Sequence, residues 1–282
     1  MSEILRDSTF MAGFNVLKRS LLENNHDELL PLAFNKLNPE WRLAEYFSKY
    51  DLFHHCNIER ENTFYRFYHE GKEVKRDEDG SLTLNILAGK EYDHPRIEGE
   101  PWPHLLIEQE FQGHHLFRMK KLTVKMSLDF LELESYMNRI RNELHTLQVS
   151  LYFALGSRNE KSKGCNDFYW FGLPFIDAPR YHFPKPWVNQ DIGKEDATNK
   201  LIYALDPHLY MKDELQVGDH LDLNMDVLPY MLEAYKKAKE MNYLRDVDFE
   251  DVEILSLNLG FEATGAFDGK IKIGGFSIVE ER

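Results

Sequence analysis

Cysteine is scarce in this sequence, with only Cys56 and Cys165 among 282 residues. So few cysteines exclude a disulfide framework, although one bond between the two is open to them, and they are typical of a reducing compartment. Neither cysteine belongs to a CxxC pair. We therefore expect both thiols to be inert.

Long hydrophobic runs are also missing. No stretch of about 18 apolar residues occurs, so the sequence predicts no transmembrane helix. Residues 1–7 lack the basic and apolar segments of a secretory signal. These absences predict a cytoplasmic protein, although an extracellular protein whose signal had been removed would give the same pattern.

Basic residues are outnumbered by acidic ones, with 34 Lys and Arg against 48 Asp and Glu and a net charge of −14. Nucleic-acid binding depends on basic patches that contact phosphates. The clearest basic clusters, residues 118–121 and 236–239, are short enough to be solvated faces. We therefore expect neither nucleic acid nor an anionic membrane as a partner.

The hydrophobic pattern changes near residue 57. Before it, apolar residues from Phe14 to Leu22 follow helical spacing, residues 28–36 suggest a further helical turn or two, and Asn38-Pro39 resembles a helix start. After it, the period becomes two, which is typical of strands. We predict a helical or irregular N-terminal extension over residues 1–56, packed on a β-sandwich domain over residues 57–282.

Many short strands are predicted in the second part. They cover residues 63–68, 81–86, 104–113, 120–135, 145–156, 167–176, 199–206, 218–227, 252–263 and 269–280. The turn 77–80 predicts a hairpin between the first two. One helix near residues 229–242 interrupts the series. Strands without regular helices between them favour a mostly β, antiparallel jelly-roll β-sandwich with one inserted helix over a parallel βαβ fold.

Three predicted strands carry short polar side chains on one face and apolar ones on the other, as half-buried strands do. The polar positions are Gln148, Ser150 and Tyr152, then His220, Asp222 and Asn224, then Ser256 and Asn258. Lys and Arg are almost absent from these faces. Such faces suit a ligand dense in hydroxyl groups; the alternative is a solvated face that happens to be poor in Lys.

Aromatic residues accompany the polar faces. Trp102 and Trp187 lie in proline-rich segments, and loops on a rigid scaffold often carry binding residues. Tyr and Trp combine an apolar ring with a polar group, which suits the mixed surface of a sugar. Trp170 fits a core position and a ligand-binding position equally well. Arg180 follows a strand end, where it could bind an acidic sugar or another carboxylate.

Glu108 and Glu110 are the strongest catalytic candidates. Successive side chains on a strand point to opposite faces, so these two share a face and Gln109 points to the other. A pair of carboxylates at this spacing could bind sugar hydroxyls, hold a cation or catalyse glycoside hydrolysis. Solvated surface charges are the remaining alternative.

Two segments resemble carbohydrate-binding jelly rolls. The acidic alternation of residues 104–113 is similar to the catalytic strand of lectin-like and glucanase-like sandwiches, which usually bears three acids where this chain has two and Gln109 between them. The glycine-rich residues 255–278 look like the closing strand pair of a galactose-binding-like module. The resemblance implies a jelly roll that binds carbohydrate.

Three functions follow as hypotheses. The first is a carbohydrate-binding protein whose partner is an oligosaccharide or glycan; its ligand-binding residues would be Trp102, Gln148, Tyr152, Trp170, Arg180, Trp187, His220, Asn224 and Asn258. The second is a glycoside hydrolase or polysaccharide lyase, with Glu108, Glu110 and Asp222 as catalytic residues. The third is a structural or interaction protein. The oligomeric state is left open.

Metal-binding motifs are lacking. No HExxH or CxxC spacing occurs, so the sequence predicts no metal site and no cofactor. Abundant Asp and Glu oxygens would suit a structural calcium ion, although no EF-hand loop is present.

Overall fold

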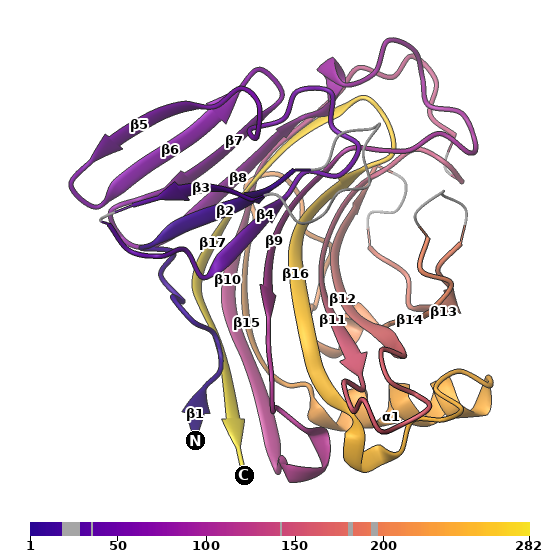
Figure 1. The fold of residues 1–282 in the computed structure, drawn as a ribbon. Coiled ribbons are helices and arrows are strands. Elements are labelled where there is room, and N and C mark those ends of the chain that lie inside the picture. Colours follow the sequence, from indigo (N-terminus) through magenta and orange to yellow (C-terminus); the bar gives the residue numbers. More distant parts are fainter. Residues whose placement is uncertain (19–28, 35, 142, 180–182, 193–196) are drawn as a thin grey trace.

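The computed structural model describes residues 1–18, 29–34, 36–141, 143–179, 183–192 and 197–282. Within these residues the chain forms two β-sheets that pack face to face, with one α-helix at one end (Figure 1). The prediction of a mostly β, jelly-roll-like sandwich with one inserted helix is therefore confirmed. The two chain ends lie side by side, because β1 pairs with the last strand, β17.

Sheet A contains eight strands among the described residues, in the order β15-β10-β17-β8-β7-β6-β5, with β1 paired to β17. Its strands are β1 (Ser2–Glu3), β5 (Asn57–Glu61), β6 (Phe64–His69), β7 (Lys72–Arg76), β8 (Leu82–Leu87), β10 (Lys121–Ser135), β15 (His220–Asp226) and β17 (Phe267–Glu281). All of its pairs are antiparallel.

Sheet B contains nine strands among the described residues, in the order β13-β14-β12-β11-β16-β9-β4-β2-β3. Its strands are β2 (Gly13–Leu17), β3 (Leu29–Ala33), β4 (Trp41–Ala44), β9 (His104–Glu110), β11 (Leu147–Gly156), β12 (Phe168–Ala178), β13 (Trp187–Gln190), β14 (Leu201–Ala204) and β16 (Glu253–Ala263). Two pairs, β12 with β14 and β2 with β4, are parallel.

The core lies between the two sheets and is built by alternation along the strands. On β11, Leu147, Val149 and Leu151 are fully buried, while the residues between them face the other side of sheet B. Burying one such side chain stabilises the fold by about 1.5–3 kcal/mol. The apolar positions therefore fix which face of sheet B is left for polar residues.

The helix α1 (Leu228–Glu240) connects β15 of sheet A to β16 of sheet B, as expected for residues 229–242. Pro229 fits its first turn, where a missing backbone N–H costs nothing. The Tyr169 hydroxyl of β12 donates to the Met231 carbonyl of the helix at 2.8 Å. In the described part of the chain, four short 3₁₀ turns occupy Ala88–Lys90, Leu116–Arg118, Pro207–Leu209 and Phe249–Asp251.

The predicted helical N-terminal extension is wrong for the described residues. Phe14 and Val16 of β2 are buried with a period of two, and so are Trp41 and Leu43 of β4. β4 pairs with β9 and with β2, so these short strands belong to sheet B. Pairing with distant strands overrides the local helical spacing, which rested partly on residues 19–28, outside the described residues.

A second difference concerns the hairpin at residues 77–80. The turn is present, with Asp77 N–H donating to the Ser81 carbonyl at 2.9 Å, but it joins β7 to β8. The strand β7 (Lys72–Arg76) escaped prediction because Lys72 and Arg76 occupy its inward positions. Both charged side chains are buried there.

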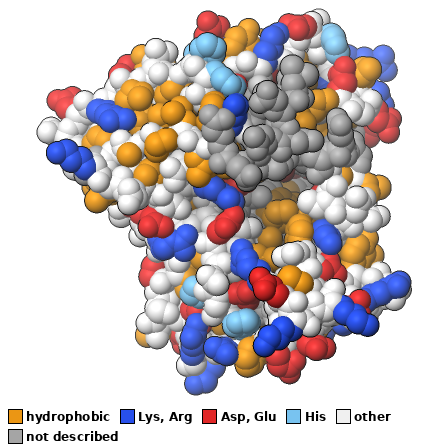
Figure 2. All heavy atoms as spheres, viewed as in Figure 1, with side chains coloured by type: hydrophobic (Ala, Val, Ile, Leu, Met, Phe, Trp, Pro, Cys, Tyr) orange, Lys and Arg blue, Asp and Glu red, His pale blue; other side chains and the backbone are white. Residues whose placement is uncertain are grey.

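The surface in Figure 2 mixes charges of both signs over its lower half, while hydrophobic side chains gather at the upper left, where β2, β3, β5 and β6 lie in Figure 1. No helix among the described residues is long and apolar enough to cross a membrane.

Candidate functional site

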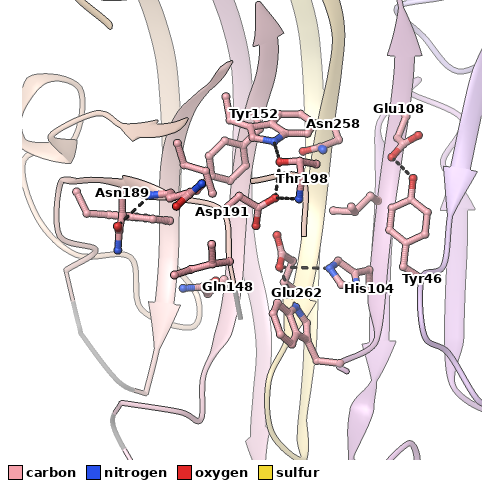
Figure 3. A pocket seen from close by; sticks show the side chains of 17 residues that line it. Tyr46, His104, Glu108, Gln148, Tyr152, Asn189, Asp191, Thr198, Asn258 and Glu262 are labelled. Atoms are coloured by element: carbon pink, nitrogen blue, oxygen red, sulfur yellow. Dashed lines mark hydrogen bonds and ion pairs between the residues drawn. The ribbon is translucent and has the colours of Figure 1, made fainter. Parts of the chain in front are cut away.

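A cavity of about 490 Å³ opens on the face of sheet B that points away from the core (Figure 3). Its floor is formed by β9, β16, β11 and β12, and its side wall by β13, β14 and the segment between them that the structure describes. Small-molecule sites in proteins usually have volumes of roughly 300–1,000 Å³.

One row of polar side chains crosses the floor. Strand register places Tyr152 of β11 opposite Asn258 of β16, and Asn258 opposite Glu108 of β9. Because paired residues on neighbouring strands point to the same face, a phenol, an amide and a carboxylate stand in line. All three line the cavity.

A second row of polar side chains lies four residues away from the first row on each of the same three strands. It contains Gln148, Glu262 and His104, paired across the same three strands. Gly260 of β16 lies between the two rows, opposite Leu106 of β9. Gly260 has a φ of +149°, and an added Cβ would lie 2.1 Å from the Leu105 carbonyl oxygen, so only glycine fits this position.

Tyr152 owes its position to a glycine on the next strand. Gly172 of β12 lies opposite Tyr152, and an added Cβ would meet the Tyr152 ring at 2.1 Å. The ring therefore lies over the glycine and meets the edge of Trp170 at a centroid distance of 6.5 Å. Burial, followed by the charge of Glu262, raises the pKa of Tyr152 well above its ordinary value, which keeps the hydroxyl protonated as a donor.

Glu108 is a buried carboxylate, with only 7% of its surface exposed. The Tyr46 hydroxyl donates to its Oε1 at 2.9 Å, and Arg42 Nη2 lies 3.4 Å from its Oε2. Arg42 also contacts Glu110 at 2.6 Å, so the two glutamates share a face. Gln109 points to the opposite side, where its side chain exchanges two hydrogen bonds with the Arg6 backbone. Glu110 lies outside the cavity lining.

His104 and Trp102 form the far end of the floor. The Trp102 indole donates to Glu262 Oε2 at 2.9 Å, and His104 Nε2 lies 3.3 Å from the same oxygen. The two rings are stacked, with centroids 5.9 Å apart. The Arg96 guanidinium lies over the Trp102 ring, 4.7 Å from its centroid. This arrangement fixes both rings before any ligand arrives.

The side wall is joined to the floor through one hydroxyl group. Thr198 donates from its backbone N–H and from Oγ1 to Asp191 Oδ2, at 2.8 and 2.6 Å. The Trp170 indole of β12 donates to the same Oγ1 at 3.2 Å. Trp187 and Asn189 of β13 also line this side. Trp187 is 40% exposed, so its indole is accessible to a ligand.

Tyr46 follows Glu45 in the chain, and Glu45 belongs to a buried cluster of titratable groups. Lys72 of sheet A binds Glu91 at 2.7 Å, and both side chains are almost without solvent contact. Glu45, which follows β4 of sheet B, lies in the same cluster and accepts the Leu52 backbone N–H at 3.0 Å. The cluster links the two sheets at the point where the chain turns toward the cavity.

Seven sequence-predicted residues meet in this cavity. Six were predicted as ligand-binding and Glu108 as catalytic; the six are Trp102, Gln148, Tyr152, Trp170, Trp187 and Asn258. The seven come from six different strands and segments. Alternation of polar and apolar residues put Gln148, Tyr152 and Asn258 on polar faces, whereas Trp102 and Trp187 were predicted from their proline-rich segments. Their roles in binding or catalysis stay predictions.

Three predicted residues lie elsewhere. His220, Asp222 and Asn224 belong to β15, an edge strand of sheet A, on the opposite side of the sandwich. The hypothesis that they belong to one binding or catalytic site with Tyr152 is therefore wrong, because alternation shows that a face is polar but not to which sheet it belongs. His220 binds Asp129 there at 2.6 Å, which raises the pKa of the imidazole. Arg180 lies outside the described residues.

Several lining residues were not among the predicted site residues. Glu262 and His104 continue the polar alternation of β16 and β9, so the pattern already contained a signal for them. Tyr46, Asn189 and Asp191 carry no such signal, because they lie in or beside short segments whose strand character was missed. Among the described residues no group of three or more His, Cys, Asp and Glu is arranged to hold a metal ion.

The fold resembles that of solved glycoside hydrolases, at low similarity. The chain matches the native family 12 xyloglucanase from Bacillus licheniformis with a TM-score of 0.43 and 8% identity, over 80% of this chain and 97% of the other. It matches the endoglucanase cel12A from Rhodothermus marinus with a TM-score of 0.41 and 9% identity, over 80% and 99%.

A third likeness is to the family 11 xylanase from Neocallimastix patriciarum, with a TM-score of 0.37 and 7% identity, over 80% of this chain and 95% of the other. No family model matches the chain, and no curated protein matches it in sequence. Likeness this distant is one of overall architecture and carries no information about substrate or activity.

Proposed function

We propose that this protein binds a glycan in the cavity on sheet B. The observation that carries this proposal is the joint presence of aromatic rings and fixed polar groups in one cavity of about 490 Å³. A sugar has apolar ring surfaces and a rim of hydroxyls. Trp and Tyr rings offer apolar surfaces, while the two polar rows offer donors and acceptors at set positions.

The polar rows are prepared for binding because their side chains are held by neighbours. Glu108 is held by Tyr46 and Arg42, and Glu262 by Trp102 and His104. Groups held in the binding geometry lose little conformational entropy when the ligand arrives. Neutral amides between them, such as Asn258, can donate and accept at once.

A glycan array followed by calorimetric titration tests this proposal. We expect at least one oligosaccharide to bind, and we expect Trp187→Ala to weaken its binding about tenfold, the loss typical of a buried aromatic contact. Phe117→Ala is the matched control, since Phe117 is 43% exposed and lies outside the lining. Absence of any binding, or an equal loss in both variants, would contradict the proposal.

Hydrolysis of the bound glycan is the second candidate function. Two carboxylates, Glu108 and Glu262, reach the cavity from neighbouring strands, and a pair of carboxyl groups is the usual machinery of glycoside hydrolysis. Glu262 replaces Glu110 and Asp222 in this hypothesis, because neither of those lines the cavity.

Release of reducing ends from the best array ligand tests the catalytic hypothesis. Glu108→Gln should abolish turnover and retain binding, whereas Glu78→Gln, an exposed change in the β7–β8 turn, should leave turnover intact. Full turnover in Glu108→Gln, or no turnover by the unmodified protein, would rule out the catalytic hypothesis. The binding proposal would not be affected by either result.

A further inference from the structure

The carboxylates of the cavity differ in how their charges are balanced. Glu108 lies beside Arg42, and Glu262 lies 3.3 Å from His104. Asp191 is different, because its side chain receives hydrogen bonds from the Thr198 backbone and hydroxyl, which are neutral donors. Both of these bonds end on Oδ2, and no bond to Oδ1 comes from the described residues.

Asp191 is held firmly in this position. Its backbone N–H donates to the Lys200 carbonyl at 2.8 Å, and its carbonyl accepts the Asn199 N–H at 3.0 Å. The carboxylate points into the cavity from the side wall and faces Glu262 on the floor (Figure 3). Lys and Arg are absent from the described lining residues. A ligand group at this point therefore meets negative charge.

We propose that the cavity selects glycans by charge, prefers sugars that carry a free amino group, and holds that group at Asp191 Oδ1. This inference rests on the proposed glycan binding and specifies its ligand class. A protonated amine donates up to three hydrogen bonds and carries the positive charge that Asp191 does not meet among the described residues. A uronic acid would place like charges together and is excluded by the same field.

Calorimetric titration with three oligomers of equal length tests the inference: glucosamine, N-acetylglucosamine and galacturonic acid. At low salt we expect the glucosamine oligomer to bind about tenfold more tightly than its acetylated form, as for one partly screened charge pair. The galacturonic acid oligomer should not bind. Added salt should reduce the preference.

Asp191→Asn provides the decisive comparison. The amide keeps an oxygen that can accept both Thr198 bonds, so the wall should stay in place and the acetylated oligomer should still bind. The preference for the amino oligomer should disappear. The preference for the amino oligomer should persist in Asp213→Asn, which removes the same charge from an exposed residue outside the lining.

The outcomes separate the two proposals. Equal or tighter binding of the acetylated oligomer, or a preference that survives in Asp191→Asn, overturns the charge selection and leaves glycan binding standing. Failure of every glycan to bind, in these titrations and on the array, overturns both.

Discussion

Glu45 is a carboxyl group shut off from solvent, with 2% of its surface exposed. Burial raises its pKa from 4.5 to about 8, against the opposing effects of Lys72 and of the hydrogen bond from the Leu52 backbone. The folded state therefore binds a proton more tightly than the unfolded chain does. The resulting stability is complete below pH 4.5 and is lost as the pH rises through about 8.

We expect Glu45→Gln to remove this pH dependence. Between pH 4.5 and 8 the free energy of unfolding of the unmodified protein should fall relative to the variant. The slope is about 1.4 kcal/mol for each pH unit at most. Urea unfolding at a series of pH values measures the difference. Glu78→Gln changes an exposed glutamate and should show the same pH dependence as the unmodified protein. If the unfolding free energy of all three proteins varies with pH in parallel, Glu45 is not the cause of the dependence.

The pair of Tyr152 and Gly172 shows what sequence can and cannot predict at the residue scale. Alternation along β11 correctly put Tyr152 on the polar face. The glycine that makes room for its ring is 20 positions away, since 172 − 152 = 20. Strand register joins the two, and register depends on tertiary pairing that one sequence does not reveal.

Gly172→Ala should push the Tyr152 ring out of place. The added methyl group overlaps the ring, and overpacking of this kind costs about 1–3 kcal/mol of unfolding free energy. Glycan affinity should fall as well. In the double variant with Tyr152→Ala, the stability cost of the added methyl should vanish, which a double-mutant cycle in urea measures. An equal cost with and without the ring would show that the overlap is not the cause.

At the scale of elements, prediction succeeded where strands are long and clearly alternating. β10, β11, β12, β16 and β17 lie close to the residues expected for them. It failed for β2, β3 and β4, which span five, five and four residues, too few for a period of two to stand out from helical spacing. In the cavity wall, β14 lies within the predicted strand 199–206, whereas β13, which spans four residues, was missed for the same reason.

The wall depends on Thr198, and this dependence is testable. Thr198→Val keeps the shape of the side chain but removes the hydroxyl that joins Asp191 to Trp170. We expect unfolding free energy to fall by about 1 kcal/mol and glycan affinity to fall several-fold, because both partners lose a fixed position. Thr63→Val, an exposed change outside the lining, serves as the control in calorimetric titration. Unchanged affinity in Thr198→Val would show that the wall is held by other contacts.

At the scale of the molecule, the two sheets form one unit whose core runs from Ile4 to Ile278. The first strands contribute to this core, with Trp41 fully buried in β4. The buried ion pair of Lys72 and Glu91, with Glu45 beside it, joins the sheets a second time. The sequence predicted the sandwich, but it separated residues 1–56 from the rest by their apparent helical spacing.

We expect thermal unfolding to be a single cooperative transition. Near-ultraviolet circular dichroism reports packing of the aromatic core, and tryptophan fluorescence includes Trp41 in the N-terminal strands. The two curves should coincide, as they do in two-state unfolding. A separate early fluorescence transition would mean that residues 1–56 unfold independently of the sandwich.

The central claim is that the cavity on sheet B, between the polar rows and the β13–β14 wall, holds a glycan. A crystal structure of the protein with the tightest oligosaccharide from the array tests it most directly. The account predicts a sugar ring packed on an indole of the lining, with hydroxyl groups within hydrogen-bond distance of Gln148 and Asn258. A sugar bound on sheet A instead, or a cavity that stays empty at saturating ligand, would contradict it.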